Sequence, residues 1–98
     1  MLQLFSWDEA KNRSNQTKHG VGFDTARLVF DDPLHVSSRE RIEHGELRWQ
    51  TIGLVGAGVL LLVVHTWDHI AADGQELIRI ISARHATKLE RRIYEKGF

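Results

Sequence analysis

The chain has 98 residues, no cysteine, and 13 basic side chains balanced by 13 acidic ones. This length suits one domain with one hydrophobic core, so we expect residues 1–98 to fold as a single unit. The lack of cysteine excludes a disulfide framework and thiolate metal sites, and the balanced charge argues against a protein that coats nucleic acid indiscriminately.

The start of the chain predicts a short strand followed by a polar helix. Residues 3–7 alternate weakly between apolar and polar side chains, as a strand does. A helix over residues 8–20 should have Asp8 as its N-cap and should end at Gly20. This helix has almost no apolar face, so we expect Trp7 and the following loop to anchor it.

A second helix and a further strand should follow. Residues 21–33 predict a shorter helix, with Asp24 as its N-cap and Pro33 at its end. Residues 34–38 indicate a strand, and residues 39–45 indicate a polar connection.

The middle of the chain predicts an antiparallel meander of three strands. Residues 46–55 alternate, residues 59–67 are apolar on both faces as a central strand should be, and residues 75–83 form the third strand. The Gly-Ala-Gly sequence at 56–58 suits a turn, and residues 68–74 indicate a loop.

A C-terminal helix completes the expected fold. Thr87 and Glu90 have the spacing of a capping box, and Gly97 stands at the helix end. We expect an α+β domain in which two N-terminal helices, a small antiparallel sheet and a C-terminal helix pack together. The apolar run 51–64 is too short to cross a membrane as a helix, and no signal-peptide pattern precedes it, so we expect a cytoplasmic protein without membrane contact.

The first candidate site lies where the third meander strand meets the last helix. Arg84 and His85 precede the first free N–H groups of that helix, so a phosphodiester there could meet a guanidinium group, an imidazole and the helix dipole. On a regular strand, Arg79 and Arg84 face opposite sides. The structural alternative is that Arg84 pairs with an acid such as Glu46 while His85 faces water.

A second candidate is a pair of charged residues on the first meander strand. Glu46 and Arg48 are two apart, so they project from the same face and could act as general base and phosphate clamp. Alternating charges on a solvent-facing strand are equally ordinary, so both interpretations stay open.

The third candidate is a stripe on the first helix. Lys11, Asn15 and Lys18 lie at i, i+4 and i+7, and His19 follows at the helix end. Such a stripe could follow a nucleic-acid backbone. A solvated face, with Asn15 tying down the next loop, is the alternative.

We expect neither a metal nor a cofactor. His65 and His69 are four residues apart with Asp68 between them, but they fall at a strand end and in a loop rather than on a helix. The glycines of residues 53–58 do not have the order of a nucleotide-binding loop.

Three segments together resemble one known family. They are WDEAKNRSNQTKHGVGFDTARLVFDDP (residues 7–33), GELRWQTIG (residues 45–53) and RIISARHATKLERRIYE (residues 79–95). They stand in the right order over nearly the whole chain. On these segments the chain is similar to BrnT-type toxins, the ribonuclease halves of bacterial type II toxin–antitoxin modules.

The resemblance implies a RelE-like fold and a metal-independent endoribonuclease that cleaves mRNA and arrests translation. It also implies a BrnA-like ribbon–helix–helix antitoxin that covers the toxin and represses their shared promoter, so the toxin would reach DNA only through its partner. For a ribonuclease of this size without a metal, the economical mechanism is attack by the 2′-hydroxyl of the RNA on the adjacent phosphate.

Our hypothesis gives each candidate residue a role in that mechanism. The residues that contact the phosphate and stabilise its charge are Arg48, Arg79 and Arg84. The acid–base and RNA-binding candidates are Glu46 or His19 as the base, His85 or Lys18 as a proton donor or backbone contact, and Lys11 as a further backbone contact.

The chain departs from the family pattern in three places. His44 and His65 stand where an aromatic residue, often tyrosine, is usual, and the loop around residues 68–75 is longer. A toxin fold that has lost its activity is therefore an alternative. Another is a non-catalytic co-repressor whose basic residues hold a DNA-binding antitoxin.

Overall fold

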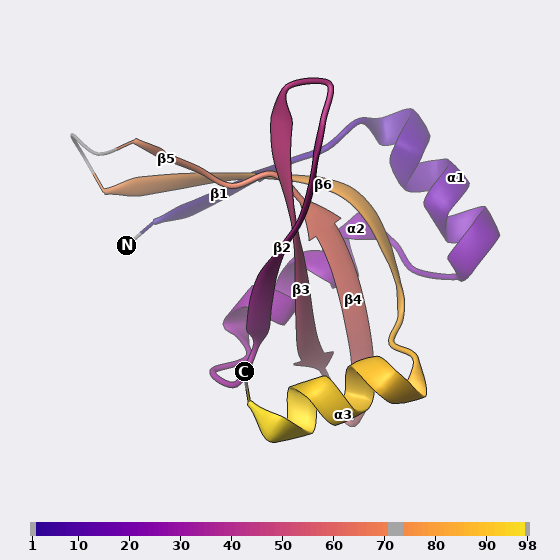
Figure 1. Ribbon diagram of the computed structural model, residues 1–98. Coiled ribbons are helices and arrows are strands. Elements are labelled where there is room, and N and C mark those ends of the chain that lie inside the picture. Colours follow the sequence, from indigo (N-terminus) through magenta and orange to yellow (C-terminus); the bar gives the residue numbers. More distant parts are fainter. Residues whose placement is uncertain (1, 71–73, 98) are drawn as a thin grey trace.

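The structure is a computed structural model that describes residues 2–70 and 74–97 (Figure 1). Its elements in chain order are β1 (Gln3–Ser6), α1 (Glu9–His19), α2 (Phe23–Ala26), the 3-10 helix η1 (Arg27–Asp31), β2 (Val36–Glu43), β3 (Glu46–Val55), β4 (Val59–His65), β5 (Asp68–Ile70), β6 (Gln75–His85) and α3 (Lys88–Lys96).

The strands form one mixed sheet in the order β1-β6-β4-β3-β2. β5 is not part of this order and pairs with β6. The pairs β2–β3, β3–β4, β4–β6 and β5–β6 are antiparallel, as the meander predicts. β1 instead pairs parallel with β6, with Leu4 opposite Leu77. A parallel pair needs a long connection, which the helices and hairpins between these strands supply. The α+β class is confirmed, and the expectation of a purely antiparallel sheet is wrong.

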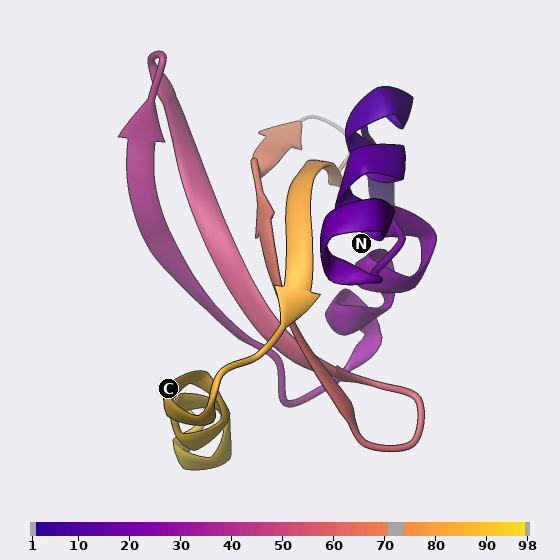
Figure 2. The ribbon, with the colours of Figure 1, turned by 90° about the vertical axis from the view of Figure 1, so that its right-hand side faces the viewer.

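Helices lie on both sides of the sheet, but they cover it unequally. In Figure 2, α1 and α2 lie on one side of the strands and α3 lies on the other, near one end. We call the side of α2 and η1 the covered face and the side of α3 the open face. The buried core of the covered face contains Val21, Phe23, Ala26, Val29, Phe30, Val55, Leu61, Val63, Ile78, Ile80 and Ala83, whereas the buried cluster on the open face contains Ile52, Leu60 and Leu62.

Gly53 lets η1 approach the covered face closely. A Cβ atom on this residue of β3 would lie 2.7 Å from Cβ and 2.8 Å from the carbonyl oxygen of Val29. Real Cβ atoms do not come so close to a backbone, so only glycine allows η1 to pack at this depth.

The ends of α1 and α3 confirm the predicted caps. The Asp8 carboxylate accepts the N–H of Ala10 at 2.8 Å, and Gly20 closes α1 with φ 72°. Thr87 begins α3 through a full capping box, and Gly97 ends it with φ 80°.

The second helix is shorter and less regular than expected. α2 is a single turn, its N-cap is Gly22 rather than Asp24, and η1 continues the chain toward Pro33. Asp24 lies in the first turn of α2, so the expectation that it caps the helix is wrong.

The polar run after Pro33 is a strand, which corrects the predicted connection over residues 39–45. β2 includes most of that run and pairs with the whole first half of β3. His44 and Gly45, with φ 53° and 77°, make the tight hairpin turn between the two strands. Pairing with β3 supplies the stability that the charged sequence of β2 does not signal locally.

The predicted loop over 68–74 contains a short strand, β5, that pairs with β6. Residues 71–73 of that loop lie outside the described residues. Among the helices of the described ranges, none is long and apolar enough to span a bilayer.

Candidate active site

A bulge in β6 decides which side chains share a face. Ile80 and Ser82 pair with consecutive residues of β4, so Ile81 is an extra residue in the register. An extra residue reverses the alternation of side chains from that point along the strand. Ile80 and Ala83, which regular alternation would put on opposite faces, therefore both lie in the core of the covered face.

The bulge brings Arg79 and Arg84 to the open face. Each is next to one of those core residues and so points away from the core. The expectation that the two arginines face opposite sides is wrong, because it assumed a regular strand. β3 adds Glu46 and Arg48 to the open face, since its side chains alternate with Thr51, which is buried on the covered face.

Arg79 and Glu46 form an ion pair across the open face. Nη2 of Arg79 donates to Oε1 of Glu46 at 2.6 Å, and both side chains are nearly half exposed. This hydrogen bond holds the pKa of Glu46 below its usual range, against some desolvation, and the charge of Arg48 acts in the same direction. Glu46 is therefore a carboxylate at neutral pH, next to a guanidinium group that solvent can reach.

Arg48 lies deeper than its neighbours, with 17% of its side chain exposed. Its Nη1 donates to Oε2 of Glu43 at 2.7 Å, and Arg41 pairs with the same oxygen at 3.0 Å. Nε of Arg48 is buried without a hydrogen-bond partner among the described residues. Buried donors of this kind are rare in folded proteins, and this one belongs to a cation of the candidate site.

Arg84 is held by Glu90 of α3. Its Nη1 and Nη2 donate to the two carboxylate oxygens at 2.8 and 2.9 Å, a bidentate pair. The pair raises the pKa of Arg84 and lowers the pKa of Glu90. The structural alternative for Arg84, an ion pair with an acid, is thus confirmed, but the acid is Glu90 and not Glu46.

Glu90 also closes the N-terminus of α3. Its Oε1 accepts the N–H of Thr87 at 2.9 Å, while the Thr87 hydroxyl accepts the N–H of Glu90. The place that the sequence assigns to a phosphate, between Arg84 and the start of the helix, therefore already holds a carboxylate of the chain. An RNA phosphate would reach the guanidinium of Arg84 by exchanging with Glu90.

The residues of the predicted stripe on α1 differ in their exposure to solvent. Lys11 and Lys18 are exposed, but Asn15 is buried. Its Nδ2 donates to the carbonyl oxygens of Val21 and Ala83, and its Oδ1 accepts the N–H of Ala83. Asn15 therefore holds the loop after α1 in place, as the structural alternative expects. It also binds the edge of β6, so its side chain is not available to RNA.

His85 faces a small surface cavity on the covered side of β6, opposite Leu61 of β4, and the residue after His19 lines the same cavity. The cavity of about 110 Å³ is lined by Gly20, which follows His19, and by His85 at the end of β6. His85 is exposed, as its structural alternative expects. Within the described ranges, no ion pair or hydrogen bond joins His19, Lys11 or Lys18 to Glu46 or Arg79.

His65 is a buried structural residue. Nδ1 faces the carbonyl oxygen of Thr66 at 2.9 Å, which only accepts, so Nδ1 carries the hydrogen. Burial lowers the pKa of His65 to about 4, so Nε2 is unprotonated at neutral pH and accepts from the Thr51 hydroxyl at 2.7 Å. Thr51 in turn accepts from Ser37 at 2.7 Å. Phe30 packs edge-on against the imidazole, so His65 occupies the place of an aromatic core residue.

His65 and His69, with Asp68 between them, have the spacing that was considered for a metal site and for which we expect no metal. His65 points into the core, and the side chain of His69 lies outside what the structure describes. No group of three potential metal-ligating side chains occurs among the described residues.

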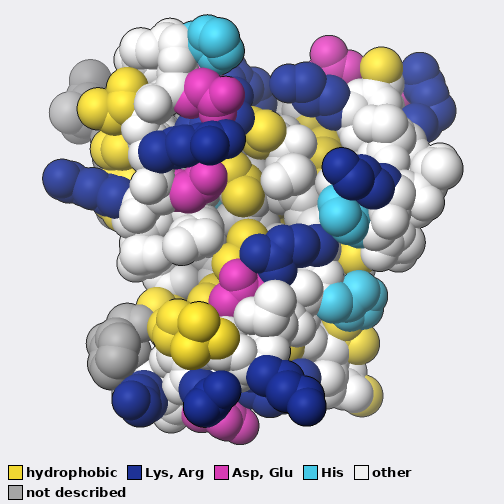
Figure 3. All heavy atoms as spheres, turned by 45° about the vertical axis from the view of Figure 1, so that its right-hand side comes forward, with side chains coloured by type: hydrophobic (Ala, Val, Ile, Leu, Met, Phe, Trp, Pro, Cys, Tyr) yellow, Lys and Arg dark blue, Asp and Glu magenta, His cyan; other side chains and the backbone are white. Residues whose placement is uncertain are grey.

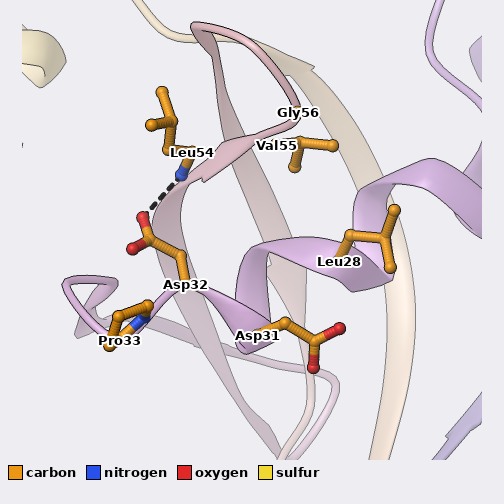
Figure 4. Close-up of a pocket in the computed structure, with 7 residues that line it drawn as sticks. All are labelled: Leu28, Asp31, Asp32, Pro33, Leu54, Val55 and Gly56. Atoms are coloured by element: carbon orange, nitrogen blue, oxygen red, sulfur yellow. Dashed lines mark hydrogen bonds between the residues drawn. The ribbon is translucent and has the colours of Figure 1, made fainter.

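Asp32 lies in the first segment of the family resemblance, but no role was predicted for it; in the structure it joins three elements. Its Oδ2 accepts the N–H of Leu54 at 2.8 Å, the dashed line of Figure 4, and the hydroxyl of Tyr94 at 2.5 Å. Burial opposes ionisation of Asp32, but these hydrogen bonds outweigh it and lower its pKa, and the carboxylate raises the pKa of Tyr94 to about 12. A cavity of about 370 Å³ lies beside it, lined by Leu28, Asp31, Asp32, Pro33, Leu54, Val55 and Gly56.

Figure 3 shows how charge is arranged over this part of the surface. Basic and acidic side chains alternate on the lobe formed by the β2–β3 hairpin, and a row of basic side chains follows α3 at the bottom. A basic side chain beside an acidic one lies in the centre, with hydrophobic side chains around it. Cations therefore border the open face at both ends.

Comparison with known proteins gives the class to which this fold and this face belong. The crystal structure of the Brucella abortus ribonuclease toxin BrnT is similar, with a TM-score of 0.60 and 26% sequence identity over 90% of this chain and 100% of that one. The fold is thus similar to that of a ribonuclease toxin. A search of curated proteins gave no match.

The sequence model of one family also matches the chain. It is described as "Ribonuclease toxin, BrnT, of type II toxin-antitoxin system", and it matches residues 7–90. The chain belongs to this BrnT family, which confirms the resemblance seen in the sequence and the toxin role. A type II toxin has an antitoxin as its partner.

Proposed function

We propose that the open face binds and cleaves RNA without a metal ion, using Arg79, Arg84 and Arg48 to stabilise the phosphate. The observation that carries this proposal is the β6 bulge. It puts both β6 arginines on the face that already carries Glu46 and Arg48. Family membership supports the reaction class, and the common face supports the choice of these residues.

The arginines suit the charge that develops during phosphodiester cleavage. Attack by the 2′-hydroxyl gathers negative charge on the phosphate oxygens, and preorganised guanidinium groups stabilise it. Each arginine is held in position by a carboxylate of the chain: Arg79 by Glu46, Arg48 by Glu43 and Arg84 by Glu90. A phosphate that replaces a carboxylate finds the guanidinium already oriented.

Glu46 is the proposed general base. It is ionised at neutral pH, and its hydrogen bond with Arg79 lowers its pKa further. If Arg79 moved to the phosphate, the carboxylate would be free to accept the 2′-hydroxyl proton. His19 is the alternative base. His85 or Lys18 would donate a proton or contact the RNA backbone, and Lys11 would extend that contact along α1.

The biological setting is part of the same proposal. Cleavage of mRNA in the cytoplasm would arrest translation, and a ribbon–helix–helix antitoxin would neutralise the toxin and carry it to DNA. The RelE-like fold implied by the sequence resemblance also belongs to this proposal.

The test is RNA cleavage by purified Arg79→Ala and Arg84→Ala variants. Removing one charge-stabilising donor typically costs about 3 kcal/mol, so each rate should fall at least about 100-fold. Arg27→Ala is the matched control, because Arg27 is exposed beyond α2 and should leave the rate unchanged. Cleavage by the parent should persist in EDTA. Full activity in both folded variants would overturn the assignment, and loss of activity in EDTA would overturn metal independence.

A further inference from the structure

A groove lies between α3 and the open face of the sheet. It has a volume of about 450 Å³ and is lined by Val36, Ser38, Gln50, Ile52, Leu62, Leu89, Glu90 and Ile93. The sheet forms its floor and α3 forms one wall. Figure 3 shows hydrophobic side chains directly above the basic row of α3.

The lining of the groove suits apolar protein side chains better than RNA bases. Five of the lining residues are aliphatic and none is aromatic. Single-stranded RNA is held mainly by stacking of its bases on aromatic rings or guanidinium planes, which the floor of this groove does not offer. Leu89 lines the groove with 63% of its surface exposed, so it presents apolar area that a partner could bury.

The helix that forms the wall of the groove is basic on its exposed side. α3 carries four cations, Lys88, Arg91, Arg92 and Lys96, and two acids, Glu90 and Glu95. Glu90 is paired with Arg84, outside the helix. Arg92 stands one turn after Leu89, so the two exposed side chains are neighbours on the helix. This surface is complementary to an acidic partner.

Glu90 connects the groove to the candidate active site. It lines the groove with part of its side chain while both its oxygens hold Arg84. A segment lying in the groove would therefore press against the Arg84–Glu90 pair. It would block the exchange by which an RNA phosphate reaches Arg84.

We propose that this groove binds an amphipathic segment of the antitoxin, with aliphatic side chains on the floor and acidic side chains facing α3. The segment inhibits the toxin by covering the Arg84–Glu90 pair. The inhibitory part of this proposal rests on the proposed function of Arg84; the docking part does not.

The first experiment measures binding of the antitoxin encoded with this toxin to Leu89→Asp by calorimetry. A carboxylate at the mouth of the groove should weaken binding at least about tenfold, as loss of an apolar anchor does. Leu34→Asp is the matched control, because Leu34 is equally exposed but does not line the groove. It should bind the antitoxin like the parent. Unchanged affinity of Leu89→Asp would overturn the proposal.

The second experiment reverses charge at two consecutive positions of α3. Arg92→Glu should weaken antitoxin binding more than Arg91→Glu, because Arg92 is the neighbour of the groove residue Leu89 on the helix and Arg91 is not. RNA affinity is measured for the same variants. If RNA binding falls while antitoxin binding is retained, the groove belongs to the substrate and the proposal is wrong. Calorimetry measures antitoxin binding without any RNA cleavage. If the parent does not cleave RNA, that result therefore contradicts the proposed function and not the docking proposal.

Discussion

The two faces of the sheet use polar residues in opposite ways. On the covered face, the polar side chains are buried and hydrogen-bonded to fixed partners, as Asn15 is to the backbone of β6 and His65 is to Thr51. On the open face, charged groups form ion pairs, and solvent can reach some of them, such as Arg79 with Glu46. Buried hydrogen bonds stabilise one structure, whereas exposed ion pairs contribute little stability and can exchange partners.

The difference indicates where stability and chemistry are located. Substitutions on the covered face should change the free energy of unfolding and affect activity only through folding. Substitutions on the open face should change RNA binding and cleavage while the fold persists. Each of the following experiments tests one side of this division.

The largest loss of stability should come from Asn15→Ala. The substitution removes three buried hydrogen bonds and leaves backbone groups of Val21 and Ala83 without partners. We expect the free energy of unfolding to fall by about 4 kcal/mol, measured by urea denaturation. Ser14→Ala, one residue earlier on the exposed side of α1, should change it by less than about 0.5 kcal/mol. Equal values for the two variants would contradict the role given to Asn15.

A slightly smaller effect is expected from pH. The folded-state pKa of His65 is lowered to about 4 from 6.5, so the unfolded chain binds the proton more readily. Stability is therefore complete above pH 6.5 and falls as the pH decreases toward 4, by on the order of 3 kcal/mol from this residue. The charge of His35 also lowers the pKa of His65.

The pH effect is checked by urea denaturation at several pH values for the parent and two variants. His65→Gln should lose most of the change between pH 6.5 and 4. His44→Asn replaces an exposed histidine in the β2–β3 turn, where asparagine accepts the positive φ, and should keep the parent profile. If the stability of His65→Gln depends on pH in the same way as that of the parent, a group other than His65 causes the loss of stability.

Local signals in the sequence predicted the elements that depend on neighbours along the chain. The bounds of β3 and the caps of α1 and α3 follow from alternation and from the residues Asp8, Gly20, Thr87 and Gly97. The charged strand β2 was missed because its stability comes from pairing with β3 rather than from its own sequence.

The features that define the candidate site depend on distant pairing. The bulge at Ile81 exists only in the register of β6 against β4, so counting along β6 put Arg79 and Arg84 on opposite faces. The capping-box spacing correctly marked Glu90 as a helix cap. It did not reveal the second role of the same carboxylate, because Arg84 meets it only once the chain turns from β6 into α3.

The smallest effect, and the sharpest test of the open face, is expected from Glu90→Gln. Glutamine can still cap α3, so the fold should lose less than about 1 kcal/mol, but the charge that holds Arg84 is gone. An RNA phosphate then meets no competing carboxylate. RNA affinity, measured by fluorescence anisotropy, should therefore rise about fivefold, which corresponds to about 1 kcal/mol.

Thr87→Ala is the matched control, because it removes the cap at a cost of about 1 kcal/mol and leaves the Arg84–Glu90 pair intact. If both variants bind RNA like the parent, exchange at Arg84 is not part of substrate binding, and the open face acts through Arg79 and Arg48 alone.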